Sequence, residues 1–179
     1  ACNTVTAQCI GYLRKKYKFP IVGIQPSVKP AAAMGRCLVL ATPSTAQSDA
    51  LKEITKKYGN DRTEIFACED LAAYVEENVF DLSEKRIASF LPSVETDTVV
   101  LGCTHYVFCK DIIKNFYKCT VFDGIEATAD HLCKILGNFD HQTNRAQKII
   151  FSDGDTDKNR CVFNYIMVKN GRLSQQRDI

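Results

Sequence analysis

Short runs of apolar and β-branched residues recur along this 179-residue chain, and stretches with helical spacing separate them. We expect strands over five of these runs, at 20–26, 36–42, 63–68, 98–103 and 119–123. Their apolar residues are continuous rather than alternating, which is typical of strands that are buried on both faces of a parallel sheet. The pattern therefore predicts an α/β fold in which helices cover both faces of a parallel sheet, an αβα sandwich.

The stretches between the runs have apolar residues at helical spacing, with Ser or Thr near several starts and Gly near several ends. We expect helices at 4–17, 44–59, 69–78, 83–91, 110–118 and 127–137. The alternation weakens after Gly137. There the sequence favours one more strand and turn at 148–155, and one or two strands with an Asn-Gly turn at 160–173.

Composition limits the class of protein and its partners. The chain is 45% hydrophobic, which is enough to bury a core, and its net charge is only +2. The lysines are scattered without aromatic interleaving, and no zinc-finger or RNA-binding signature occurs, so nucleic acid is not an expected partner. No apolar run approaches the ~20 residues of a membrane span, and no signal peptide is recognisable. We therefore expect a cytoplasmic protein with no membrane partner.

Nine cysteines are spread evenly through the chain, and an odd number without an export signal favours reduced thiols over disulfides. Free cysteine is among the most frequently buried residue types. We therefore expect most of these thiols to be small core residues, namely Cys9, Cys37, Cys68, Cys109, Cys119, Cys133 and Cys161.

The stretch LGCTHY (101–106) stands at the end of a predicted strand and places a thiol, a hydroxyl and an imidazole on consecutive residues, Cys103, Thr104 and His105. Core packing does not require this combination. Ligands of parallel α/β sheets collect beyond the carboxyl ends of the strands, so the stretch is a candidate site. The first residues, ACNT (1–4), have a similar order of a small residue, a cysteine and polar groups, again followed by a helical pattern.

Two such corners facing each other would place one thiol on each side of a small molecule. One thiolate can remove the α-proton of a carbon acid, while the other thiol delivers a proton to the opposite face, and the result is racemisation. Cys2 and Cys103 would be this pair, and His105 is a neighbour that could tune Cys103. The groups that could hold the carboxylate and ammonium of an amino acid are those of Asn3, Thr4 and Thr104.

Other kinds of site have less support. A zinc site at Cys2, Cys103 and His105 is disfavoured because C-x-H is not a usual ligand spacing and no C-x₂-C occurs. No P-loop or GxGxxG is present, so a nucleotide site is not indicated. The residues FSDGD (151–155) are most simply a turn.

Four stretches carry a resemblance to a known family: ACNT (1–4), PIVGIQPSVKPA (20–31), ATPSTAQS (41–48) and VVLGCTHY (99–106). In this order they resemble the motifs of glutamate racemases. The two thiol motifs alone are similar to all cofactor-independent amino-acid racemases, aspartate racemase included, whereas the block at 20–31 favours glutamate. The resemblance implies a racemase without pyridoxal phosphate or any other cofactor, which makes D-glutamate for peptidoglycan at a site between two α/β lobes.

The resemblance also implies roles for particular residues. Cys2 and Cys103 would be the two acid–base thiols, and His105 would tune Cys103. The substrate contacts would be Asn3, Thr4, Thr42, Thr45, Thr104 and His105. Thr42 and Thr45 are equally interpreted as turn and helix N-cap residues, and one threonine can do both.

Members of the resembled family carry a strand and an Asp-Ser-Gly-rich loop before the motif that stands here at 1–4. The resemblance therefore predicts one complete lobe at 22–124, and a second, N-terminally truncated lobe made of 1–21 and 125–179. Such a lobe would leave a sheet edge and an apolar helix face exposed, so we expect self-association, for example as a homodimer. Two functions remain open: an active glutamate racemase, or a non-catalytic remnant that at most binds an acidic amino acid.

Overall fold

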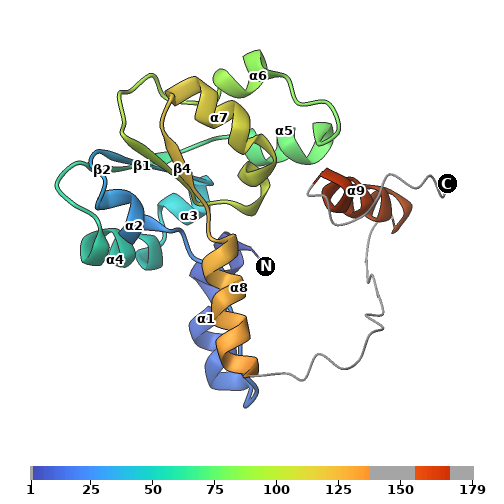
Figure 1. Ribbon diagram of the computed structural model, residues 1–179. Coiled ribbons are helices and arrows are strands. Elements are labelled where there is room, and N and C mark those ends of the chain that lie inside the picture. The colour runs from blue at the N-terminus through green and yellow to red at the C-terminus, as the bar shows by residue number, and fades with distance from the viewer. Residues whose placement is uncertain (1, 138–155, 170–179) are drawn as a thin grey trace. The chain divides into compact units, whose positions relative to one another are not determined.

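The computed structural model describes residues 2–137 and 156–169 (Figure 1). Contacts divide the chain into two units, one made of 1–78 with 82–138 and the other of 79–81 with 139–179. The first unit contains the sheet and all the predicted site residues. The division into lobes at 22–124 and at 1–21 with 125–179 stays a prediction.

Four parallel strands form the sheet, in the order β2-β1-β3-β4. They are β1 (Cys37–Ala41), β2 (Thr63–Ala67), β3 (Thr98–Leu101) and β4 (Thr120–Phe122). In the centre, β1 pairs with both β2 and β3, so that Leu40 lies opposite Phe66 on one side and Leu101 on the other. The predicted parallel sheet is confirmed, with four of the five expected strands within one or two residues of their expected bounds.

The remaining described elements are helices. They are α1 (Asn3–Lys16), α2 (Val28–Ala32), α3 (Pro43–Ala46), α4 (Asp49–Tyr58), α5 (Leu71–Asn78), α6 (Glu84–Ala88), the 3₁₀ helix η1 (Thr104–Cys109), α7 (Lys110–Tyr117), α8 (Ile125–Leu136) and α9 (Thr156–Lys169). Within these ranges, none of the helices is both long and apolar enough to cross a membrane.

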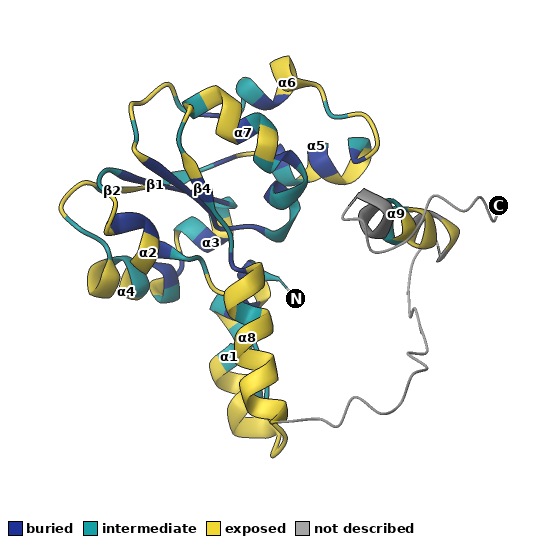
Figure 2. Ribbon diagram, in the orientation of Figure 1, coloured by how far each residue is buried: buried dark blue, intermediate teal, exposed yellow. Residues whose placement is uncertain are grey.

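Helices cover both faces of the sheet, and two separate apolar cores result (Figure 2). Leu38 and Leu40 of β1 face the larger core, with α5, α6, η1 and α7. Cys37 and Val39, which alternate with them, face the smaller core, with α2 and α4. Every residue of β1 is buried, so its continuous apolar run reflects burial on both faces of the sheet, as the sequence predicts.

The expected strand at 20–26 is wrong, because this segment is irregular chain between α1 and α2. Proline occupies both its ends, and proline lacks the N–H that a sheet ladder requires. The segment instead packs against α1. A Cβ atom on Gly23 would lie 2.5 Å from Cγ2 of Thr6, so only glycine allows this approach.

The helix expected at 44–59 is divided into α3 and α4 by side-chain caps. Ser48 accepts a hydrogen bond from the backbone N–H of Leu51 at 3.2 Å and so begins α4 as its N-cap. A serine inside a helical pattern often marks such a start. The break lets α3 remain at the carboxyl end of β1 while α4 packs along the sheet face.

The second unit contains a further difference. The segment 160–173 was expected to contain strands, but α9 occupies 156–169. Its β-branched and aromatic residues mimic a strand over a short window, whereas an ion pair of 3.7 Å between Asp157 and Arg160, three residues apart, is a helical contact. The strand expected at 148–155 and the Asn-Gly turn at 170–171 lie outside the described residues.

Candidate active site

The carboxyl ends of β1 and β3 form the part of the sheet where a ligand site is expected. After β1 the chain forms β2 on one side of β1, and after β2 it crosses back to form β3 on the other side of β1. The connections after these two neighbouring strands therefore diverge, and such a switch point is where parallel α/β folds bind ligands. Thr42 follows β1 directly, and Gly102 and Cys103 follow β3.

Gly102 allows the two strand ends to approach closely. Its N–H donates to the carbonyl oxygen of Leu40 at 2.7 Å, and a Cβ atom at this position would lie 2.9 Å from that oxygen and 3.1 Å from Cβ of Ala41. The glycine of the predicted motif is thus a packing requirement. It holds the next residue, Cys103, beside the end of β1.

Cys103 is buried and stands immediately before η1, with His105 one residue into that helix. The Sγ atom of Cys103 lies 3.7 Å from Nδ1 of His105, and Nε2 of His105 lies 2.6 Å from Oε2 of Glu76. These contacts form a chain from thiol to imidazole to carboxylate. Thr104, the remaining member of the predicted trio, is half-buried at the first position of η1.

The pKa of His105 is raised to about 9. The hydrogen bond with Cys103 is the largest cause, and the hydrogen bond and charge of Glu76 act in the same direction, while burial opposes them. An imidazole with this pKa carries a proton at neutral pH, so His105 presents an N–H to each neighbour.

Sequence reasoning missed Glu76. It lies on α5, whose residues pack against η1, and it is next to another glutamate, Glu77. The sequence predicts that Glu76 and Glu77 both lie on the helix that follows β2, and β2 ends at the same edge of the sheet as β1 and β3. Only the packing of α5 on η1 distinguishes the glutamate that reaches His105 from its neighbour.

Three threonine hydroxyls hold the start of α1 at the carboxyl end of β1. The Oγ1 atom of Thr4 lies 3.1 Å from that of Thr42 and 2.8 Å from that of Thr45, and Thr42 donates to Thr45 at 3.0 Å. Thr42 is also the N-cap of α3, since it accepts from the backbone N–H of Thr45 at 3.3 Å. Both interpretations of Thr42, site residue and cap, therefore fit its position.

Cys2 is the residue before α1, half-buried and extended, two positions from Thr4. The hydroxyl contacts of Thr4 thus bring the first predicted thiol to the carboxyl end of β1, and the pairing of β1 with β3 brings Cys103 to the carboxyl end of the neighbouring strand. Residues far apart in the sequence share one edge of the sheet. Their roles in binding or catalysis stay predictions.

Asn3 is placed differently from its threonine neighbour. Its side chain is buried, at 4% exposure, and its Nδ2 atom has no hydrogen-bond partner among the described residues. It lines a small, partly open cavity of about 30 Å³ together with Thr6, Ile10, Thr45, Leu51 and other residues. A cavity of this size holds a water molecule. Direct binding of a ligand by the Asn3 amide requires that it turn out of this cavity.

The other seven cysteines were all expected to be core residues, and only part of that expectation is confirmed. Cys37, Cys68 and Cys109 are buried, and burial raises the pKa of the Cys68 and Cys109 thiols to about 12. Two others, Cys9 and Cys119, are half-buried. Cys133 on α8 and Cys161 on α9 are exposed, so the expectation is wrong for these two. All nine thiols are free.

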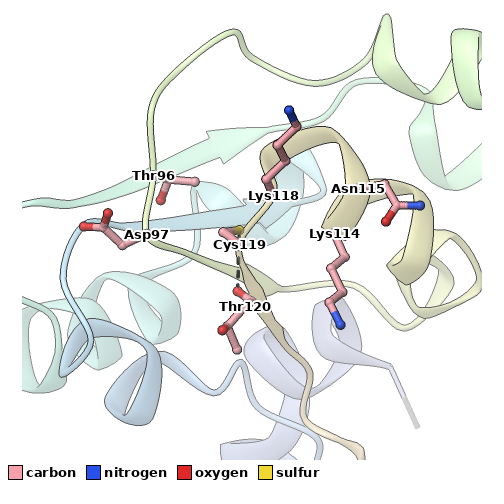
Figure 3. Close-up of a pocket in the computed structure, with 7 residues that line it drawn as sticks. All are labelled: Thr96, Asp97, Lys114, Asn115, Lys118, Cys119 and Thr120. Atoms are coloured by element: carbon pink, nitrogen blue, oxygen red, sulfur yellow. Dashed lines mark hydrogen bonds between the residues drawn. The ribbon is translucent and has the colours of Figure 1, made fainter.

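A polar hollow lies at the opposite, amino-terminal edge of the sheet (Figure 3). It is formed around the starts of β3 and β4 by Thr96, Asp97, Lys114, Asn115, Lys118, Cys119 and Thr120. Asp97 is already paired with Arg36, at 3.3 Å. The hollow contains none of the predicted site residues. Over the described part of the chain, no three His, Cys, Asp or Glu side chains converge as metal ligands.

Comparisons with known proteins give a consistent result. A family model described as Asp/Glu/Hydantoin racemase matches residues 1–132. The chain is 35% identical over 144 residues to a glutamate racemase of Leptospira interrogans, an alignment that covers 76% of this chain and 56% of that protein. It is also 35% identical over 176 residues to a glutamate racemase of Halothermothrix orenii, covering 89% of this chain and 69% of that one.

Solved structures share the fold. Glutamate racemase of Escherichia coli, in a complex with L-glutamate and the activator UDP-MurNAc-Ala, has a TM-score of 0.78 at 24% identity, over 93% of this chain and 68% of that chain. The structure from Aquifex pyrophilus has a TM-score of 0.63 at 27% identity, over 97% and 69%. The chain spans only slightly more than half the length of the Leptospira relatives that it matches.

Proposed function

The chain belongs to the Asp/Glu/hydantoin racemase family, and from this membership we propose that it interconverts L-glutamate and D-glutamate by acid–base chemistry at two thiols. The observation that carries the proposal is the hydrogen-bonded chain from Cys103 through His105 to Glu76. It lies at the carboxyl end of β3, next to the carboxyl end of β1 where Cys2 is held. The choice of glutamate is supported by the names of the relatives at 35% identity.

In one direction the thiolate of Cys103 removes the α-proton from one face of the substrate, and the thiol of Cys2 donates its proton to the other face. The product has inverted configuration, Cys103 is left as the thiol, and Cys2 is left as the thiolate. In the other direction the roles are exchanged. Both directions need one thiol and one thiolate, because the carbon must lose one proton and gain one.

His105 serves the Cys103 side of this cycle as a positioning residue. With a pKa of about 9 it is an imidazolium at neutral pH, so Nδ1–H faces the Sγ atom while Nε2–H donates to Glu76. The cation stabilises negative charge on the sulfur atom, and the carboxylate of Glu76 fixes the ring orientation.

The hydroxyls of Thr4, Thr42, Thr45 and Thr104 are proposed to hold the substrate. Each hydroxyl donates one hydrogen bond and accepts two, so the cluster can exchange a mutual hydrogen bond for one to a carboxylate oxygen or to the ammonium group. These hydroxyls leave the α-carbon to the two thiols, and no step requires a cofactor.

The cellular setting belongs to the same proposal. We infer that the D-glutamate supplies peptidoglycan synthesis and that the protein works in the cytoplasm. Nine free thiols support a reducing compartment, since cysteines of oxidising compartments are usually paired.

Self-association is supported by α8. Among the described residues of this helix none is buried, and the large apolar side chains Ile125, Leu132, Ile135 and Leu136 are all exposed. Apolar residues at helical spacing usually face another surface. A second copy of the chain is the partner that we propose, and light scattering at several protein concentrations tests it.

Exchange of the α-proton tests the racemase proposal. We would incubate the chain with L-glutamate and with D-glutamate in deuterium oxide, follow the α-proton by NMR and follow inversion by circular dichroism. Exchange with inversion is expected. Cys103→Ala and Cys2→Ala should each abolish inversion, whereas the matched controls Cys133→Ala and Cys161→Ala should not change it. A folded chain that shows no exchange would favour the alternative, a non-catalytic relative that at most binds an acidic amino acid.

A further inference from the structure

The end of α1 and the residues after it form a compact surface of cations and aromatic rings. The stretch YLRKKYKF (12–19) contains four basic and three aromatic residues. All of them are exposed, and two of the rings, Tyr12 and Phe19, have 62% and 63% of their surface in solvent. Figure 2 shows the end of α1 in the colour of exposed residues. We call Tyr12, Arg14, Lys15, Lys16, Tyr17, Lys18 and Phe19 the basic-aromatic tip. The prediction of scattered lysines without aromatic interleaving is therefore wrong for this stretch.

The charge of this surface is not balanced locally. Residues 1–48 contain no aspartate or glutamate at all, although the whole chain has 21. Within the described ranges, no ion pair joins the tip to a carboxylate. Arg14 donates to the carbonyl oxygen of Ile21, which fixes the turn after α1 but leaves the positive charge uncompensated. The tip is therefore a positive patch of several charges within two turns of chain.

The rings and the cations are arranged together. The Nζ atom of Lys16 lies 5.5 Å from the ring centroid of Tyr12 and 5.5 Å from that of Tyr17, and the rings of Tyr17 and Phe19 are 5.2 Å apart. Cation–π contacts hold the rings on the surface. Phe19 has no polar group, and 63% of its surface is exposed although the ring packs against Tyr17. Leaving such a ring in water is unfavourable, so the surface suits a partner with an apolar layer beneath an anionic one.

We propose that the basic-aromatic tip binds the surface of an anionic lipid bilayer. Lysines near a bilayer are attracted to anionic head groups, and aromatic rings settle at the boundary between head groups and acyl chains. The tip would place the lysine ammonium groups among the head groups and Phe19 below them. The protein would lie on the bilayer surface without spanning it. The expectation of no membrane partner rested on the absence of a spanning run, and it does not cover this mode of binding.

The alternative partner with the same charge is single-stranded nucleic acid, and the geometry favours it less. Nucleic acid binding needs a track of cations along the backbone and aromatic faces that are free to stack on bases. Here the positive charges form one cluster, Lys16 lies over one face of Tyr12 and one face of Tyr17, and Tyr17 also packs with Phe19. An apolar ring among lysines matches a bilayer surface better than it matches a phosphate backbone.

The first experiment measures binding of the full chain to vesicles by sedimentation. Binding is expected with vesicles of phosphatidylglycerol and phosphatidylcholine, and not with phosphatidylcholine alone. The triple variant K15Q/K16Q/K18Q should bind roughly 100-fold more weakly, since each lysine at an anionic surface contributes a several-fold effect. The matched control K52Q/K56Q/K57Q removes three exposed lysines of α4 and should bind nearly as well as the original chain. Absence of binding, or equal loss in the two triple variants, would overturn the proposal.

A second experiment tests insertion of the ring. The chain contains no tryptophan, so Phe19→Trp introduces a single tryptophan at the tip. Its emission should shift to the blue with anionic vesicles, whereas Met34→Trp, at an exposed turn elsewhere, should not shift. If Phe19→Trp gives no shift, and a single-stranded oligonucleotide binds the chain more tightly than the vesicles do, the tip is a nucleic acid site and the lipid proposal fails.

Discussion

The Oε2 atom of Glu76 lies 2.6 Å from Nε2 of His105, and the other ring nitrogen of that histidine faces Sγ of Cys103 at 3.7 Å. The imidazole is held from both sides, by a helix that packs on η1 and by the residue that begins η1. Glu76 does not reach the thiol itself. Its influence on Cys103 passes through the charge and the orientation of the ring.

Glu76→Gln should lower the pKa of His105 from about 9 towards the ordinary value of about 6.5, because a charged hydrogen-bond acceptor is replaced by a neutral one. Glu77→Gln is the matched control and should leave the pKa of His105 unchanged. NMR titration of the ring proton measures both, and His105→Asn identifies its signal among those of the three histidines. Equal shifts in the two glutamine variants would contradict the contact.

The same pKa predicts how stability depends on pH. The pKa of His105 is higher in the folded chain than in the unfolded one, so folding favours the protonated ring. This contribution is complete below about pH 6.5 and is lost as the pH rises through 9. The free energies of unfolding of the original chain and of His105→Asn, measured by urea denaturation, should therefore become more similar as the pH rises over this range. Ionisation of the buried cysteines at high pH also lowers the stability of the fold, but it does so equally in both proteins.

Gly102→Ala should destabilise the fold by about 1–3 kcal/mol, because the new Cβ atom would meet the carbonyl oxygen of Leu40 and Cβ of Ala41, and the central strands cannot separate freely. Gly11→Ala is the control. Gly11 is exposed inside α1 with no neighbour within 4 Å of its Cβ position, so alanine there should stabilise by up to about 1 kcal/mol. Chemical denaturation measures both, and a neutral Gly102→Ala would refute the close approach.

Alkylation of the native chain should separate the cysteines by their surroundings. Cys133 and Cys161 are exposed and should react first with iodoacetamide, whereas Cys37, Cys68 and Cys109 should react only after unfolding. Burial raises the pKa of these three, and the thiolate is the reactive form. Mass spectrometry of peptides taken over time gives the order. Early modification of Cys68 or Cys109 would show that the larger core opens readily.

Much of the first unit was predictable because its signals are local. Continuous apolar runs identified β1 to β4, and the position of LGCTHY after one such run identified the edge of the sheet where the candidate site residues lie. Threonines next to these runs gave Thr42 and Thr45 as cap or site residues. These inferences need only the length and composition of a buried strand and the rule that ligands collect at the carboxyl ends of strands.

The inferences that failed depended on contacts between distant segments. The run at 20–26 has strand composition, but its proline ends and its packing against Thr6 exclude it from the sheet. Glu76 is distinguished from Glu77 only by which helix face meets η1. Cysteine is often buried, yet Cys133 lies on α8, which has no buried residue among those described. The type of a residue indicates whether it tends to be buried, but the contacts between distant segments determine whether it is.

The threonine contacts also show how the two thiol positions are joined. Thr4 and Thr42 are 38 residues apart, and β1 pairs with β3 across an even longer stretch of chain. Contacts between distant segments form slowly, because long loops must close before such contacts can be made. We therefore expect the edge that unites Cys2 and Cys103 to be complete only when both of these long-range contacts have formed.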